Sequence, residues 1–255
     1  MIFDDINNQI SNFKGHVGYY YYNLNENYEY GYNENDLFLA ASVIKFPIYC
    51  VICKLVSENK LSFNEKIDVK EKDKLPSCGA LNAITGEFSI DIESLCNLMI
   101  RISDNSATNL LIKRLGIDFL NEQFKQIGLK QTHLERVLFD SESSKKGFEN
   151  RICLKELGLL LKEIYNEEFV NPDVSKYILD CLLKQQINHK IPGYLNDSVD
   201  VAHKTGEDDN LSNDIGIVLT KKPFVICFAG HDVNVKEWEI FIRETSEKLV
   251  SEFNR

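Results

Sequence analysis

Apolar residues recur at helical spacing near the N-terminus, through the middle of the chain and at its end. Ile2, Phe3, Ile6, Ile10 and Phe13 share one side of a helix, so residues 2–14 are predicted to form an amphipathic helix. The same periodicity predicts seven more helices, separated by polar or Pro- and Gly-bearing loops: residues 43–58, 91–102, 105–115, 117–127, 153–165, 173–185 and 235–253.

Runs rich in β-branched and aromatic residues lie on both sides of the helical middle. They predict five strands, at residues 16–24, 28–32, 198–204, 214–219 and 224–229. The first two strands flank an Asn-rich turn and the last two flank a Pro-bearing turn, and such short connections favour an antiparallel sheet.

This order of elements predicts an α/β fold of the α+β type, in which an antiparallel sheet is flanked by the N- and C-terminal helices. Residues 1–40 and 196–255 are expected to form the sheet domain together, and residues 41–195 an all-helical domain inserted between them. Clefts between two such domains are common ligand sites, so a site is expected where the two meet.

Composition narrows the class of protein. The chain has 255 residues and a formal net charge of −10, with 44% hydrophobic and 27% charged residues. These hydrophobic and charged fractions are typical of a globular protein. The net negative charge argues against a nucleic-acid partner, because a protein that binds nucleic acid needs clustered Lys and Arg. No run approaches the ~18 apolar residues of a membrane span. A monomer that acts on a small molecule is expected.

The N-terminus and the cysteines bear on the compartment. The first residues lack the basic and apolar regions of an export signal, so the chain as written is predicted to be cytoplasmic, or extracytoplasmic if its N-terminus has been trimmed. Seven cysteines without framework spacing indicate small buried apolar residues in a reducing compartment. Cys50 and Cys53 form a Cys-x-x-Cys pair inside an apolar helix, where core packing is the expected role.

A search for catalytic nucleophiles singles out one of four Ser-x-x-Lys pairs. Ser42 and Lys45 stand at the start of an apolar helix, one turn apart on one face, where hydroxyl and amine can meet. Apolar neighbours such as Phe46 and Ile48 would lower the proton affinity of Lys45, so that it can accept the serine proton. The alternative is a capping serine beside a lysine at the edge of the core. The other three pairs are Ser11/Lys14, Ser57/Lys60 and Ser143/Lys146.

Two rarer triplets follow in the chain. Ser103-Asp104-Asn105 is predicted in a loop between helices, and Lys204-Thr205-Gly206 at the end of a strand. Each is expected by chance only ~0.05 times in a chain of this length. The alternatives are a helix cap and a strand that ends in a turn.

The three motifs, in this order, resemble those of the class A β-lactamase and penicillin-binding protein superfamily. The similarity extends over nearly the whole chain, through residues 41–45, 103–110, 201–207 and 213–218. It implies a β-lactamase-like fold, in agreement with the predicted elements.

The resemblance also implies roles for individual residues. Ser42 would be the acylated nucleophile, Lys45 its proton acceptor, and Ser103 a relay to the leaving nitrogen. Asn105 would bind the substrate side-chain amide or hold Lys45. For the substrate-binding strand, Lys204 and Thr205 would hold the substrate carboxylate, Gly206 would leave room for substrate along the strand edge, and the N–H groups of Ser42 and Glu207 would form the oxyanion hole.

One feature departs from the family. Class A enzymes carry a loop glutamate two residues after an arginine, and here that position after Arg136 is Leu138, which cannot act as a base. Glu135, Asp140 and Glu142 are nearby substitutes, with solvated surface charges as the alternative.

Acylation is therefore expected to be intact and deacylation slow. The predicted function is a serine hydrolase that is acylated at Ser42 and cleaves the β-lactam amide. The alternatives are a penicillin-binding or sensor protein with a lasting adduct, and a D-alanyl peptidase or esterase.

Other residues are expected to be structural. His203 would point to the opposite face of its strand from Lys204. The remaining histidines are isolated in the sequence, and no metal or other cofactor is expected. The run Tyr19–Tyr22 is interpreted as strand surface, because no basic residues interleave with it.

Overall fold

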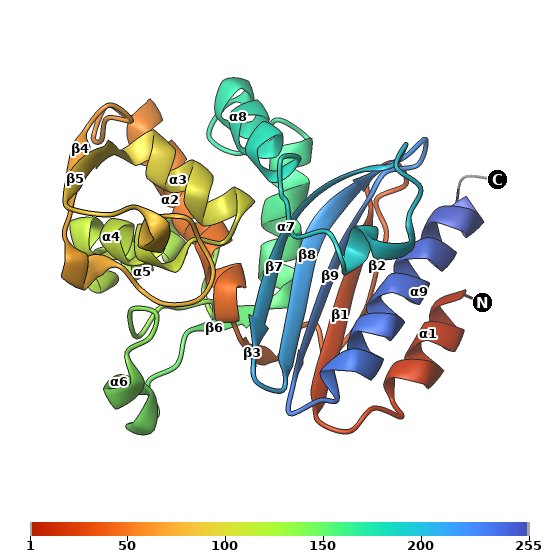
Figure 1. Cartoon of the computed structure of the whole chain (residues 1–255). Coiled ribbons are helices and arrows are strands. Elements are labelled where there is room, and N and C mark those ends of the chain that lie inside the picture. Colours follow the sequence, from red (N-terminus) through yellow and green to blue (C-terminus); the bar gives the residue numbers. More distant parts are fainter. Residues whose placement is uncertain (1, 254–255) are drawn as a thin grey trace.

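The computed structural model describes residues 2–253, which form one sheet flanked by helices and a second, mostly helical part (Figure 1). Nine α-helices lie in the described residues: α1 (Ile2–Ile10), α2 (Lys45–Ser57), α3 (Ile92–Arg101), α4 (Asn105–Leu115), α5 (Ile117–Gln126), α6 (Ser141–Lys145), α7 (Leu154–Tyr165), α8 (Pro172–Leu182) and α9 (Val235–Phe253). Each of them is too short or too polar to span a lipid bilayer.

The main sheet has five antiparallel strands in the order β2-β1-β9-β8-β7. These strands are β1 (His16–Asn23), β2 (Glu29–Tyr32), β7 (Asp200–Asp208), β8 (Leu211–Leu219) and β9 (Phe224–His231). Strands from the two ends of the chain meet where β1 pairs with β9. Because β7 lies at an edge of this sheet, one side of its backbone is left to meet other parts of the protein.

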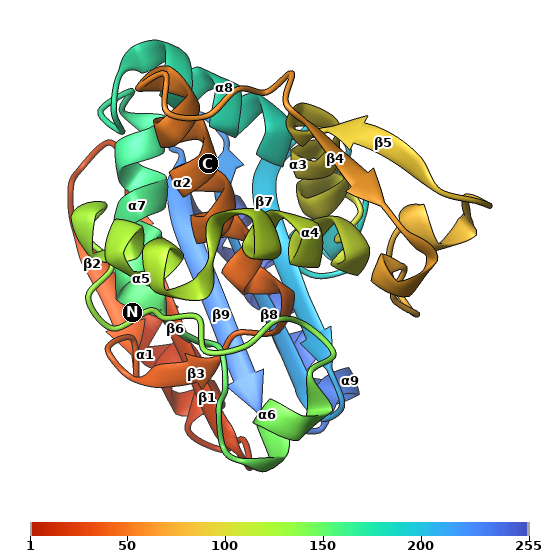
Figure 2. The same ribbon diagram turned by 90° about the vertical axis from the view of Figure 1, so that its left-hand side faces the viewer.

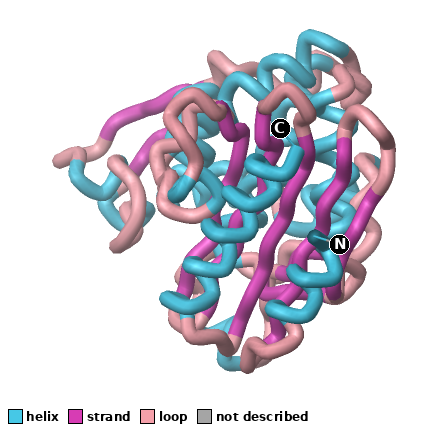
Figure 3. Tube along the Cα trace, turned by 90° about the vertical axis from the view of Figure 1, so that its right-hand side faces the viewer, coloured by secondary structure: helices cyan, strands magenta, loops and turns pink. Residues whose placement is uncertain are grey.

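Each face of the sheet has its own apolar core. Helices α1 and α9 cover one face, as Figure 3 shows, and α7 packs against the other. Tyr19 and Tyr21 point into the first core, and Tyr20 and Tyr22 into the second, as the alternation of a strand requires. The interpretation of this run as strand surface is therefore wrong, since all four rings are buried.

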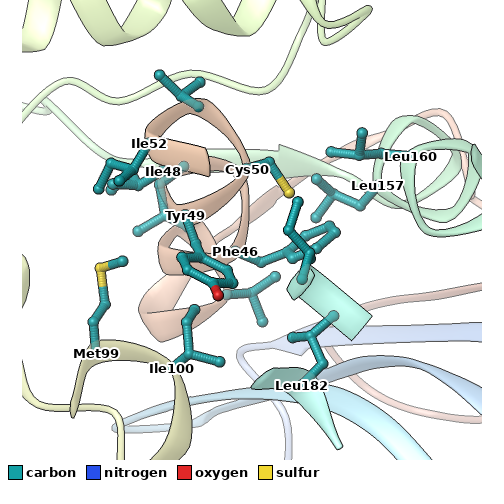
Figure 4. Close-up of a cluster of buried hydrophobic side chains, with 14 of the residues drawn as sticks. Phe46, Ile48, Tyr49, Cys50, Ile52, Met99, Ile100, Leu157, Leu160 and Leu182 are labelled. Atoms are coloured by element: carbon teal, nitrogen blue, oxygen red, sulfur yellow. The ribbon is translucent and has the colours of Figure 1, made fainter. Parts of the chain in front are cut away.

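The second core continues into the helical part, where α2 is the central element. Figure 4 shows side chains of α2 against those of its neighbours: Phe46, Ile48, Tyr49, Cys50 and Ile52 meet Met99, Ile100, Leu157, Leu160 and Leu182. Cys50 and Cys53 are both buried in this core, which confirms the packing role expected of them.

Helix α7 lies unusually close to the sheet. A Cβ atom added at Gly158 would lie 2.2 Å from Cδ1 of Tyr20, so only a glycine permits this approach. This approach therefore depends on a residue that costs ~1 kcal/mol relative to alanine inside a helix.

The predicted fold class is confirmed, but the structure also contains two small two-stranded sheets that the sequence did not indicate. They are β4 (Lys66–Val69) paired with β5 (Phe88–Asp91), and β6 (Arg151–Cys153) paired with β3 (Leu37–Leu39) from the N-terminal segment. Each of these strands has only three or four residues, too few to show the alternation of apolar and polar residues that predicts a strand. The division into residues 1–40 with 196–255 and residues 41–195 remains a proposal, because α7 belongs to the middle segment and packs on the sheet.

Candidate active site

A cleft of about 650 Å³ lies between the edge strand β7, the turn before α2, the loop before α4 and the loop that carries α6. The loop with α6 and the β7–β8 turn lie at the same end of the molecule (Figure 2). Five of the eight predicted site residues line this cleft: Ser42, Ser103, Asn105, Thr205 and Glu207. The other three do not line the cleft but adjoin residues that do: Lys45 and Lys204 are hydrogen-bonded to Ser103, and Gly206 lies between Thr205 and Glu207.

Ser42 does not open helix α2 as predicted. It lies on the preceding 3₁₀ turn, Ala41–Ile44, and α2 begins at Lys45. Ala41 has φ +43°, a left-handed conformation that costs an alanine free energy. Asn213 of β8 holds this turn by donating from Nδ2 to the carbonyl oxygens of Leu39 and Ala40, at 2.9 and 3.2 Å.

Lys45 is fully buried and directed at the loop before α4. Its Nζ donates to the Ser103 carbonyl oxygen at 2.7 Å, to Ser103 Oγ at 3.0 Å and to Asn105 Oδ1 at 2.7 Å. Burial, and then the positive charge of Lys204, hold the pKa of the Lys45 amine well below its usual range. Within residues 2–253, no hydrogen bond joins Lys45 to Ser42.

Lys204 approaches the same hydroxyl from the sheet. Its Nζ donates to Ser103 Oγ at 3.1 Å and to the Thr205 carbonyl oxygen at 2.8 Å, and the side chain is fully buried. Burial and the charge of Lys190 lower the pKa of Lys204 to about 7. Ser103 therefore stands between two lysines from different parts of the chain.

The loop of Ser103 is fixed by the next residue, Asp104. Its Oδ1 accepts from the N–H of Ala107 and caps α4, which the sequence offered as the alternative reading of this triplet. Its Oδ2 accepts from the N–H groups of Ala80 and Leu81 at 2.6 and 2.9 Å. Ser103 itself has φ +57°, so the loop carries backbone strain at the residue between the two lysines.

The structure gives a second reason, besides room for a substrate, why residue 206 is a glycine. A Cβ atom there would lie 3.0 Å from the Ala40 carbonyl oxygen and 3.1 Å from the Val43 nitrogen. The glycine therefore lets the turn that carries Ser42 lie against the edge of β7. Its role beside a substrate remains a prediction.

Three asparagines hold the backbone of the loop that closes the cleft. Asn109 Oδ1 accepts from the N–H of Leu138, and Asn109 Nδ2 donates to the Leu138 carbonyl, both at 2.8 Å. Asn121 makes the same pair of bonds with Leu134. Asn150 accepts from the N–H groups of residues 135 and 136.

The carboxylates around Leu138 are already engaged. Leu138 lines the cleft with Ser42, and so does Asp140, whose carboxylate accepts from the N–H and hydroxyl of Ser143. These bonds hold the pKa of Asp140 below its usual value, which makes it a weak base. Glu135 and Glu142, the other expected substitutes, are not among the residues that line the cleft.

Four residues of the site were not singled out in the sequence. Glu149 lines the cleft and pairs with Arg136 at 2.7 Å, and Lys190 is buried behind Glu207. Asn109 and Asn213 occur within the quoted motif stretches, but nothing in a single sequence separates a tethering asparagine from a surface one.

The histidines are less isolated than the sequence indicated. His203 is buried, with Nδ1 3.0 Å from Asp214 Oδ1 and Nε2 2.9 Å from Asn188 Oδ1, which supports a structural role. His189, Glu207 and Glu239 place one ligand atom each within 4.8 Å of one another. Lys190 donates to the same oxygen of Glu207, so the positive charge of its ammonium would disfavour a metal cation between these three residues.

Comparisons with known proteins agree on one family. The model of the Beta-lactamase enzyme family matches residues 1–253. The β-lactamase VEB-1 of Pseudomonas aeruginosa is 26% identical, over 97% of this chain and 86% of its own length. The β-lactamase BRO-1 of Moraxella catarrhalis is 27% identical, over 75% of this chain and 63% of its own length.

Solved structures agree with this result. The structure of PBP-A has a TM-score of 0.90 and 27% identity, and the match covers 99% of this chain and 95% of that one. A point mutant of PBP-A, solved as an acyl-enzyme complex with penicillin G, matches equally well. An ancestral class A β-lactamase has the same TM-score at 18% identity, which shows the fold.

The chain therefore belongs to the Beta-lactamase enzyme family and has the class A β-lactamase fold. By family it is a β-lactamase-like serine hydrolase.

The loop tether gives a first prediction. Asn109→Leu should lower the free energy of unfolding by about 2–4 kcal/mol, because two hydrogen bonds are lost and two backbone groups of Leu138 are left unpaired. Urea unfolding measures the stability, and limited proteolysis measures opening of residues 136–150. Asn121→Leu is the matched control, with the same bonds lost at Leu134. Equal proteolysis of the two variants and the wild type would contradict the tether.

Proposed function

We propose that Ser42 is the nucleophile of this hydrolase and that β-lactams acylate it. The observation that carries the proposal is the convergence of Lys45 Nζ and Lys204 Nζ on Ser103 Oγ, in a cleft that also exposes Ser42. Two lysines are buried there at one hydroxyl, and a buried lysine of lowered pKa is suited to act as a base.

The proposed acylation proceeds in two steps. Ser42 Oγ attacks the β-lactam carbonyl carbon, Lys45 takes the hydroxyl proton, and the N–H groups of Ser42 and Glu207 stabilise the oxyanion. The amide C–N bond then breaks, and Ser103 Oγ passes a proton to the leaving nitrogen. Lys45 replaces that proton through its hydrogen bond to Ser103, so the lysine ends neutral.

The substrate carboxylate is proposed to bind on the sheet side of the cleft. Thr205 lines the cleft there, whereas the Lys204 ammonium is buried behind it. The hydroxyls of Thr205 and Ser103 would therefore touch the carboxylate, and Lys204 would supply the charge behind them.

Deacylation is proposed to be slow, so that the acyl adduct is long-lived. Leu138 lines the cleft and follows Arg136 by two residues, where the resemblance to class A enzymes implies a base, and the Asp140 carboxylate beside it is held by Ser143. The similarity to PBP-A, one structure of which is an acyl-enzyme complex with penicillin G, supports a penicillin-binding protein as the second candidate. A D-alanyl-type substrate for the same serine remains a prediction.

Compartment and assembly are also proposals. Seven cysteines are free and six of them are buried, which fits the predicted cytoplasmic, reducing location. We likewise propose a monomer.

The nucleophile is tested by intact-mass spectrometry after incubation with a chromogenic β-lactam. We expect one covalent adduct per chain in the wild type and none in Ser42→Ala. Ser57→Ala is the matched control, because it removes an exposed serine from another Ser-x-x-Lys pair. An adduct on Ser42→Ala would refute the assignment, and steady turnover without an adduct would contradict slow deacylation.

The pH dependence of acylation follows from the two lysines. Efficiency should rise with pH as Lys45 loses its proton, and for carboxylate-bearing β-lactams it should fall above about pH 7 as Lys204 becomes neutral. Second-order acylation rates measured on both sides of about pH 7 give the two limbs. A penicillin methyl ester should lack the alkaline limb, and an identical limb for the ester would contradict the role of Lys204.

The missing base gives a further prediction. Leu138→Glu should shorten the lifetime of the acyl adduct by about tenfold or more, because general-base catalysis contributes ~10²–10⁴-fold when well placed. The time course of adduct loss by mass spectrometry measures it. Leu138→Gln introduces a side chain of the same size as glutamate without a base and should leave the lifetime unchanged. Equal lifetimes for Glu and Gln would show that residue 138 cannot place a base.

A further inference from the structure

A third buried lysine lies beside the cleft, outside the catalytic motifs. The Lys190 side chain is completely shielded from solvent, and its Nζ donates to the carbonyl oxygens of Gly206 and Asn213 at 3.2 and 3.3 Å. Its third partner is Glu207 Oε1, at 2.8 Å. Lys190 therefore sits against the strand that carries the Lys-Thr-Gly motif.

Glu207 separates this lysine from the cleft. Its side chain is 48% exposed and lines the cleft, and its Oε1 also lies 3.2 Å from His189 Nε2. The hydrogen bond from His189, and then the charge of Lys190, lower the pKa of Glu207 to about 2, so it is ionised throughout the neutral range. A ligand in the cleft meets the Glu207 carboxylate where it would otherwise meet the Lys190 ammonium.

The pairing also controls the charge next to Lys204. Lys190 lowers the pKa of Lys204, whereas Glu207 and Asp214 raise it. Around the pair lie His189, Glu239 and Arg243, and the cleft side adds Asp208 and Asp209. The Glu207 carboxylate thus compensates the positive charge of Lys190, which could otherwise attract the carboxylate of a substrate.

We propose that the Glu207 side chain determines substrate charge specificity: it neutralises Lys190 and makes the site select weakly for acyl donors with a carboxylate next to the scissile bond. Donors whose carboxylate is esterified or absent lose less than they would if the Lys190 charge were unpaired. This inference rests on the proposed acylation at Ser42 and concerns the side chain of Glu207, whereas the oxyanion role concerns its backbone.

The test compares acylation by benzylpenicillin with acylation by its methyl ester, at low ionic strength. The rate constant for benzylpenicillin divided by that for the ester should rise about tenfold in Glu207→Gln. This is the effect of removing one unit charge ~6 Å from the substrate carboxylate at an effective dielectric constant near ~40. Glu239→Gln is the matched control, because it removes a charge from the same His189 outside the cleft, and its ratio should change less than about twofold.

A binding measurement keeps the inference independent of acylation. In the Ser42→Ala background, Glu207→Gln should tighten the binding of N-acetyl-D-alanine, a carboxylate that cannot acylate the protein, by about tenfold. An unchanged ratio and affinity, or equal changes in Glu239→Gln, would overturn the role of Glu207. If neither penicillin nor its ester acylates the wild type, the proposed function fails. The binding of N-acetyl-D-alanine then still shows whether the Glu207 charge weakens the binding of a carboxylate.

Discussion

Two buried amines that share one hydroxyl are the constraint on which the site depends. Lys45 Nζ and Lys204 Nζ lie 3.0 and 3.1 Å from Ser103 Oγ, and neither is exposed. Burial penalises the charged form of each, and neighbouring positive charge adds to the penalty, so both pKa values fall. Only a neutral amine can accept a proton from a serine, and a lowered pKa makes the neutral form more available than it is for an ordinary surface lysine.

Holding the two amines together requires contact between the two parts of the chain. Lys45 and Ser103 come from the helical part, and Lys204 comes from the edge strand of the sheet. Gly206 allows the turn before α2 to approach that strand, and Asn213 binds the same turn through its carbonyl groups. The cleft therefore lies where the two parts meet, and loosening either contact would separate Lys204 from Ser103.

The sequence predicted the parts of this arrangement that local patterns encode. All the described helices except α6, the five strands of the main sheet and the three motifs follow from periodicity and from rare triplets, and five of the eight predicted site residues line one cleft. It could not predict Lys190, because a lysine in a polar loop is normally solvated, and its burial depends on a tertiary partner, Glu207. Tyr19–Tyr22 misled for a related reason, since alternation does not reveal that both faces of a strand are covered.

Acylation and deacylation depend on different kinds of structure in this fold. Ser42 lines the cleft, whereas Lys45, Ser103 and Lys204, which are proposed to support its acylation, are buried and share hydrogen bonds, so that a change in one disturbs the others. Leu138, at the position where the resemblance implies a deacylating base, lines the cleft from a loop whose backbone Asn109 holds by two hydrogen bonds. Because that tether uses only the main chain of Leu138, its side chain is not needed to keep the loop in place. In the proposed reaction, the residues for acylation can therefore be kept while the side chain at position 138 alone changes how long the acyl group remains.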